Sequence, residues 1–266
     1  MVFAALDGGS KELSAKYKLR FMPDGIAFAI WGLIYLLLGI YVAYQAIPQN
    51  FISSRNEYIF RVCSPCLLIY SVMGVGWLGI FNSDTTNDFW KAQFLIVLML
   101  ISALIPMMAF SRTRLNTFEA LVCYPAFSLL AGWLTSATIL GFVFCLASMG
   151  MTKDNGYDDK LLNTYAIIMY WVAELVFVIA SFRERNIVYG SVWIWTAFNI
   201  LRKQRNDFLS GEENKDILKP IELNLNIILA VHTLFLVFLM VRRGMQYKKG
   251  QKIGQPESES QKKLLP

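Results

Sequence analysis

Long apolar runs dominate the chain, and short polar stretches separate them. Each run is continuous rather than alternating between apolar and polar positions, which favours helices over barrel strands. A bilayer core about 30 Å thick is crossed by roughly 20 apolar residues in a helix. Seven runs are therefore predicted as transmembrane helices: Ile26–Ile47, Ile59–Phe81, Ala92–Phe110, Phe118–Met149, Leu161–Phe182, the shorter Ile187–Leu201, and Ile221–Val241.

These runs predict an all-α fold, a polytopic membrane protein built as a bundle of about seven transmembrane helices. Helices satisfy their own backbone polar groups, which lipid cannot do. The chain divides into an N-terminal tail over 1–22, a transmembrane domain over 23–243 and a polar C-terminal tail over 244–266. The N-terminal tail can form a basic amphipathic helix. The composition of the C-terminal tail is typical of disordered segments.

Composition and charge agree with a membrane protein. Hydrophobic residues make up 56% of the chain and charged residues 17%, whereas soluble chains carry about 25% charged residues. The basic residues of the tails and connections would meet lipid phosphates, so membrane lipid is an expected partner. Nucleic acid is not expected, because no polar segment is long enough to fold as a binding module.

The distribution of positive charge does not orient the bundle. Twelve of the 25 Lys and Arg residues fall on the N-terminal side of the predicted bundle and the other thirteen on the opposite side. Since orientation follows the side with more basic residues in its loops, the sequence predicts no topology.

Small residues recur at helical spacing in two runs. Gly25, Gly32 and Gly39 repeat every seven residues, and Gly132 lies midway between Ser128 and Ser136. Small residues let helices approach closely in lipid. The interpretation is close helix packing.

Large aromatic rings form a second pattern. Trp31 and Tyr35 lie on one stripe of the first predicted helix, and Trp77 and Trp133 lie within later runs. An indole deep inside a span has to find a partner for its N–H group. Such rings either pack in the core or line a pocket for a flat apolar ligand.

Two segments resemble signature stretches of the TspO/tryptophan-rich sensory protein family, and more closely its longer seven-span relatives. The first is Phe21–Tyr35 (FMPDGIAFAIWGLIY), which contains a Trp-x-x-x-Tyr motif. The second is Tyr124–Ile139 (YPAFSLLAGWLTSATI), which contains a Trp-x-x-x-Ala-Thr motif. The resemblance implies a helical bundle that binds porphyrins, cholesterol or similar apolar ligands. The implied ligand-binding residues are Trp31, Tyr35, Trp77 and Trp133.

The chain departs from that family at two positions. An Asn of the family lies three residues before the second-helix Trp, where this chain has Gly74 before Trp77. Another Asn often follows the later Trp by eight residues, where this chain has Gly141 after Trp133. These amides could reach a ligand, so their absence argues against the ligand-binding role of the family. It does not argue against the family's helical bundle.

Two functions follow from this comparison of motifs. The first is a non-enzymatic TspO-like membrane protein that holds a tetrapyrrole or a sterol within its bundle. The alternative is an accessory structural subunit of a multi-subunit membrane complex, such as a mitochondrial respiratory complex. The expected protein partners are other membrane subunits or a second copy in a homodimer. The mitochondrial inner membrane is the location compatible with the alternative.

Two ionisable residues lie in the middle of predicted spans, Glu174 in the fifth and His232 in the last. Ionisable groups inside a membrane are functional candidates by default, and a buried carboxyl either protonates or pairs. A contact between these two residues would serve as a proton-responsive site, as an anchor for a basic ligand or as a tie between helices. The tie is the favoured hypothesis.

Catalytic and metal-binding signals are weak. Cys63 and Cys66 form a Cys-x-x-Cys motif without a second pair, whereas a structural zinc site takes four ligands. The sequence contains no Gly-rich phosphate loop, nucleophile elbow or carboxylate cluster. No enzymatic activity, no metal and no cofactor are expected.

Overall fold

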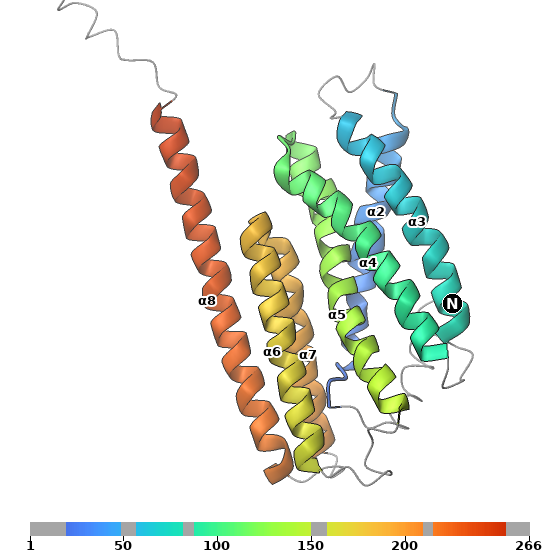
Figure 1. The fold of residues 1–266 in the computed structure, drawn as a ribbon. Coiled ribbons are helices and arrows are strands. Elements are labelled where there is room, and N and C mark those ends of the chain that lie inside the picture. Colours follow the sequence, from blue (N-terminus) through green and yellow to red (C-terminus); the bar gives the residue numbers. More distant parts are fainter. Residues whose placement is uncertain (1–19, 49–56, 82–87, 150–158, 210–214, 254–266) are drawn as a thin grey trace, which may run out of the picture.

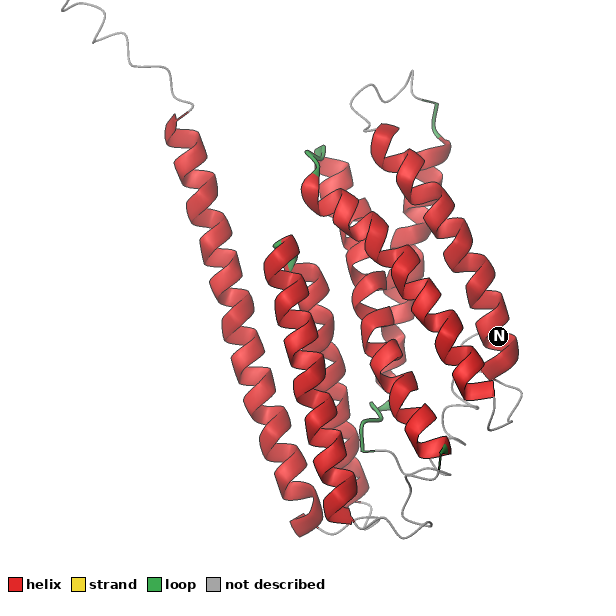
Figure 2. Cartoon of the chain, viewed as in Figure 1, coloured by secondary structure: helices red, strands yellow, loops and turns green. Residues whose placement is uncertain are grey.

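A computed structural model of the protein describes residues 20–48, 57–81, 88–149, 159–209 and 215–253. The regular elements within these ranges are helices (Figures 1 and 2). A short 3-10 helix, η1 (Gly25–Ala29), leads directly into α2 (Ile30–Ala46). The remaining elements are α3 (Glu57–Phe81), α4 (Asp88–Arg112), the π-helical turn η3 (Glu119–Cys123), α5 (Tyr124–Ser148), α6 (Asp159–Glu184), α7 (Ile187–Leu209) and α8 (Lys215–Ile253).

The predicted all-α membrane bundle is confirmed, with one long helix for each apolar run. Six candidate spans within the described residues are long and apolar enough to cross a membrane. α7 is the exception, because its sequence is more polar and includes the buried Thr196, Asn199 and Gln204. α7 packs against α5, α6 and α8. A helix enclosed by protein in this way keeps polar side chains that would be costly against lipid.

α5 lies at the centre of the bundle. It contacts α2, α4, α6 and α7, whereas α3 packs mainly on α4 and α8 packs on α6 and α7. α3 and α8 therefore lie on opposite sides of the molecule (Figure 1). The most apolar stretch of α5 is 56% buried, against 28–39% for the other candidate spans. The helix with two predicted signature features, the Trp133 motif and the small-residue repeat, is thus the one most enclosed by protein.

Gly132 allows α5 and α7 to approach closely. A Cβ atom at this position would lie 2.8 Å from Val192 Cγ2 and 3.0 Å from the Tyr189 carbonyl oxygen. Hydrogen bonds along the same face join the two helices and pair polar groups inside the membrane. They are Asn186 Nδ2 to Ser128 Oγ at 2.8 Å, Thr135 Oγ1 with Tyr189 Oη at 3.0 Å, and Ser136 Oγ with Thr196 Oγ1 at 3.1 Å.

The small-residue prediction holds for α5 and not for α2. Gly32 and Gly39 are exposed, and a Cβ atom at either position would meet nothing within 4 Å. The close packing predicted for these two glycines is therefore not found within the described part of the chain.

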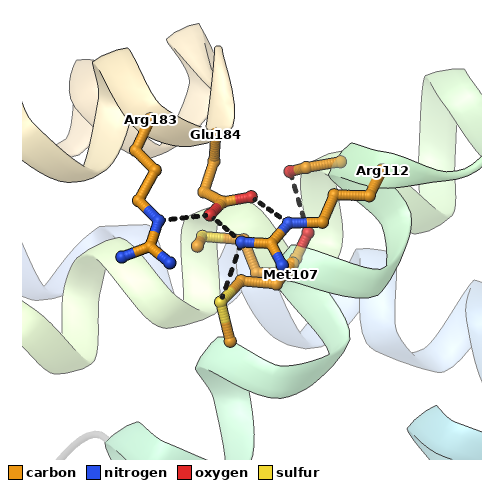
Figure 3. A network of polar contacts seen from close by, with 6 residues as sticks. Met107, Arg112, Arg183 and Glu184 are labelled. Atoms are coloured by element: carbon orange, nitrogen blue, oxygen red, sulfur yellow. Dashed lines mark hydrogen bonds and ion pairs between the residues drawn. The ribbon is translucent and has the colours of Figure 1, made fainter.

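An ion-paired cluster ties the end of α4 to the end of α6 (Figure 3). The Arg112 guanidinium donates from Nε to Glu184 Oε2 at 2.9 Å and from Nη2 to Glu184 Oε1. Arg183 Nε lies 3.7 Å from the same carboxylate. The Glu184 side chain is only 4% exposed, and its charge is compensated by these guanidinium groups.

Packed or helical structure extends beyond the range 23–243 predicted for the transmembrane domain. Most of the predicted N-terminal tail, including its amphipathic helix, lies outside the described residues. Its last residues belong to the bundle, because Phe21 and Met22 are 1% and 4% exposed. The Tyr170 hydroxyl donates to the Arg20 carbonyl oxygen at 2.5 Å, and Gln204 Nε2 donates to it at 3.1 Å. At the other end, α8 continues past the predicted boundary at 243 and ends at Ile253.

Replacing Gly132 tests the contact between α5 and α7. We expect Gly132→Ala to lower the free energy of unfolding by about 1–3 kcal/mol, since the added methyl meets Val192 and backbone atoms. Gly32→Ala is the matched control on an open face, where it should be neutral or stabilising by up to about 1 kcal/mol. Thermal unfolding in mild detergent measures both variants. Equal effects of the two substitutions would contradict the close contact.

Candidate functional site

A cavity of about 90 Å³ lies between the helices at the end of the bundle where α4 begins and α5 ends. Its walls are mainly apolar. Trp31 of α2, Trp77 of α3 and Trp133 of α5 all line it, so three helices contribute one indole each. The other aromatic and aliphatic lining residues are Phe21, Met22, Pro23, Phe28, Phe89, Ala92, Ile96, Met99, Leu134, Ala137, Leu140 and Phe144.

Edge-to-face contacts fix the aromatic wall. The rings of Trp31 and Trp133 have centroids 6.2 Å apart and are inclined by 81°. Phe28 meets Trp133 in the same manner at 5.6 Å. Trp31 and Trp133 are 7% and 3% exposed. Packing of these rings against one another therefore sets the shape of the wall.

Tyr35 lies apart from the cavity. Its ring stacks on Trp31 with centroids 5.1 Å apart, and the residue is 43% exposed. It is not among the lining residues. The structure thus brings together three of the four predicted ligand-binding residues and places the fourth behind one of them.

The segment before α2 reaches the cavity because α7 holds it in place. Trp195 Nε1 donates to the Ala27 carbonyl oxygen at 2.9 Å. The Asp24 N–H donates to the Asn199 carbonyl oxygen at 3.0 Å, and the Asp24 side chain accepts from the Ile26 N–H to cap η1. These bonds position Phe21–Pro23 as a wall.

The polar lining residues were not found from the sequence. Gln93 of α4, Ser136 of α5 and Thr196 of α7 face the cavity. Gln93 Nε2 donates to the Thr138 carbonyl oxygen at 2.9 Å, which links α4 to α5. Gln93 Oε1 is buried and has no hydrogen-bond partner among the described residues. The only feature of the sequence that could have indicated Gln93 is its position as an amide near the start of the apolar run Ala92–Phe110.

Gln93 occupies the space that a side chain at position 141 would fill. A Cβ atom built on Gly141 would lie 2.1 Å from Gln93 Oε1. An amide from α4 therefore fills the space beside this position of α5. At Gly74 the nearest atom is Met99 Cε, 3.5 Å from an added Cβ atom, and not an amide.

Glu174 and His232 meet in a buried polar network, and neither residue lines the cavity. His232 Nδ1 lies 3.0 Å from both carboxyl oxygens of Glu174. Trp193 Nε1 donates to Glu174 Oε2 at 2.8 Å, and His232 Nε2 lies 3.1 Å from the Gly190 carbonyl oxygen. His232 is 0% exposed and Glu174 is 5% exposed. The network joins α6, α7 and α8 in the interior.

Hydrogen-bond chemistry limits the protonation of this network. His232 Nε2 carries a proton, because the Gly190 carbonyl can only accept. One further proton lies between His232 Nδ1 and Glu174, either as an imidazolium with a carboxylate or as two neutral groups. Both arrangements have no net charge. A neutral, fully paired network suits a tie between helices, which supports the hypothesis favoured from the sequence.

Metal-ligand geometry is not apparent in the described ranges. They contain no group of three or more His, Cys, Asp or Glu residues placed to hold a metal ion. Cys63 and Cys66 are buried in α3 and form no disulfide.

The fold and the cavity define the class: an integral membrane protein with a tryptophan-lined cavity between its helices. A family model described as TSPO-like protein matches residues 3–245. The chain therefore belongs to the TSPO-like protein family, and the resemblance of its two motif segments is confirmed. No curated protein and no solved structure was found to match the chain.

Substitutions at Glu174 test the tie between α6, α7 and α8. We expect Glu174→Leu to cost roughly 3 kcal/mol of unfolding free energy, because Trp193 and His232 lose their buried partner. Glu174→Gln should retain most of the stability. Its amide oxygen can accept from Trp193, and its amide nitrogen can donate to neutral His232. Thermal unfolding in detergent compares the two variants, and an equal loss for both would show that the charge itself is required.

Proposed function

We propose that this TSPO-like protein is a non-enzymatic binding protein that holds a flat apolar ligand of the tetrapyrrole or sterol class in the cavity. The observation that carries the proposal is the convergence of Trp31, Trp77 and Trp133 on one cavity. Aromatic faces and edges provide large apolar contact areas for planar molecules. Ligand cavities in helix bundles characteristically combine such walls with a few polar groups.

The size of the cavity constrains how such a ligand would bind. At about 90 Å³, it is smaller than the engineered cavity of about 150 Å³ that accommodates benzene. A tetrapyrrole or sterol would therefore insert one edge or one ring, and the rest of the molecule would extend between the helices. Met22 and Met99 line the cavity, and flexible thioether side chains adapt readily to an inserted group.

The chemistry of the lining supports binding rather than catalysis. The described residues that line the cavity include no Asp, Glu, His, Lys, Arg or Cys. General acid–base catalysis uses such groups at the reacting atoms, and the two hydroxyls of the wall, Ser136 and Thr196, have no such base among these lining residues to activate them as nucleophiles. Glu174 and His232, the ionisable pair of the interior, are not lining residues. The proposal thus assigns them to stability and assigns recognition to the cavity.

Ligand binding is tested by quenching of tryptophan fluorescence on addition of protoporphyrin to the full-length protein in mild detergent. We expect saturable quenching in the wild-type protein and at least tenfold weaker binding for Trp133→Ala, which loses the ring that contacts Trp31 and Phe28. Trp90→Ala is the matched control, because Trp90 is 43% exposed and does not line the cavity. Equal affinities for the two variants would contradict the proposed site.

Purification of the full-length protein in mild detergent also tests the alternative role, an accessory subunit of a membrane complex. An accessory subunit would purify with other membrane subunits in fixed stoichiometry and would show no saturable binding of protoporphyrin or sterol. Fractionation of the source cells would place such an assembly in the mitochondrial inner membrane. A monomer or homodimer with a bound apolar ligand would favour the binding protein.

A further inference from the structure

We infer that the end of the bundle where α4 and α6 end binds the phosphate headgroups of anionic phospholipids. Arg112, Arg183 and Arg242 define this arginine surface, and Arg183 and Arg242 are the residues that contact the headgroup. The cavity lies toward the opposite end, where α4 begins. The inference therefore adds a binding surface to the proposed function and does not depend on it.

Three membrane-spanning helices reach the arginine surface at one depth. Arg112 is the last residue of α4 and Arg183 the last but one of α6, whereas Arg242 directly follows the apolar run of α8. Contacts join them there. Arg112 donates to Glu184, the neighbour of Arg183 (Figure 3), and the Arg242 guanidinium carbon lies 5.2 Å from the centre of the Phe182 ring. Since an apolar run of spanning length ends where the hydrocarbon ends, these guanidinium groups lie at the level of the lipid headgroups.

Arg183 and Arg242 have N–H donors available to a headgroup. The Arg183 side chain is 76% exposed, and its polar contact within the described part of the chain runs from Nε to the Glu184 carboxylate at 3.7 Å (Figure 3). Arg242 lies over the Phe182 ring and forms no ion pair with the described residues. A planar guanidinium group with free donors matches the oxygen atoms of a phosphate. Arg112 differs, because Glu184 occupies its Nε and Nη2 atoms, so its role is to hold the surface together.

The acidic side chains of this end are largely withdrawn from its surface. Three acidic residues lie here within the described ranges. Glu119 and Glu184 are buried, and Glu57 is half-buried. Glu119 accepts from the Asn116 N–H at 3.1 Å, so its carboxylate is directed into the structure. A headgroup phosphate that approaches this end therefore meets guanidinium groups and little opposing negative charge.

Exposed carboxylates accompany the basic residues at the opposite end. The Asp216 side chain is 79% exposed and pairs with Lys219 at 2.7 Å. The Glu222 side chain is 40% exposed and pairs with Arg205 at 2.7 Å. The two ends have nearly equal numbers of basic residues, so the difference between them lies in the exposure of their acidic side chains. An anionic headgroup is thus attracted to the arginine surface and opposed by carboxylates at the other end.

The continuation of α8 adds positive charge on the same side. The helix runs on from Arg242 to Ile253. Residues 242–253 include five basic residues and no acidic residue. A basic cluster directly after a transmembrane helix is typical of segments that bind anionic lipid. The local sequence of α8 and the packing of α4 and α6 therefore indicate the same partner.

Native mass spectrometry of the full-length protein in mild detergent tests the inference. It measures the Kd of the first bound phosphatidylglycerol and of phosphatidylcholine with the same acyl chains. We expect wild-type protein to bind phosphatidylglycerol about twentyfold more tightly. Each of the two arginines contributes about fivefold, which is the typical effect of one basic residue near an anionic lipid surface.

Variants at the two ends separate a local surface from overall charge. Arg183→Gln combined with Arg242→Gln should bind the two lipids with nearly equal Kd, and Arg183→Gln alone should reduce the preference about fivefold. Lys160→Gln combined with Arg202→Gln is the matched control, because it removes two exposed positive charges at the opposite end. The control should keep the wild-type preference. Thermal unfolding verifies that each variant is folded, and Arg112 retains its pair with Glu184 in all of them.

Several results would overturn the inference. Equal wild-type Kd values for the two lipids would do so, as would a preference that persists without Arg183 and Arg242. An equal loss in the control would assign the preference to the net charge of the protein. Competition by millimolar inorganic phosphate, at constant ionic strength, would identify a soluble phosphate compound and not a lipid as the occupant. Protoporphyrin binding is measured separately, so failure of the proposed function would leave these results unchanged.

Discussion

Lipid offers no hydrogen bonds, and this constraint explains most of the polar contacts inside the bundle. A polar side chain within the hydrocarbon is tolerated where another helix provides its partner. α7 shows the consequence most clearly. Its Tyr189 pairs with Thr135, its Thr196 pairs with Ser136 and its Trp193 pairs with Glu174. The polar side chains of α7 would be costly against lipid, so the helix packs among its neighbours, and those neighbours provide the hydrogen-bond partners that its polar side chains need.

Close approach of backbones makes these pairs geometrically feasible. Gly132 brings α5 against α7, and Gly190 brings α7 against α8, where an added Cβ atom would lie 2.7 Å from Leu236 Cδ2. The Gly190 carbonyl is thereby available to His232 Nε2. Small residues and polar networks thus depend on each other in this protein.

The sequence predicted the helices and part of the site. Continuous apolar runs of spanning length identify six of the helices without a structure, and a shorter run over 187–201 indicates α7. Trp31 and Trp133 were identified by motif and Trp77 as the tryptophan of the second predicted helix, and all three line one cavity. Tyr35 follows Trp31 by one helical turn, yet its ring lies outside, because the cavity meets α2 on a narrow face. Gln93 was missed, since nothing along α4 shows that it points toward Gly141.

The sequence by itself determined that the chain lies in lipid, which segments form its long helices and which rings are large enough to build an apolar wall. These properties are local, because they depend on the length and composition of single segments. Only the tertiary structure decided that Glu174 meets His232 and that an amide from α4 fills the space beside Gly141. Such pairings depend on the rotation and depth of each helix against its neighbours, which are set by packing across the whole bundle.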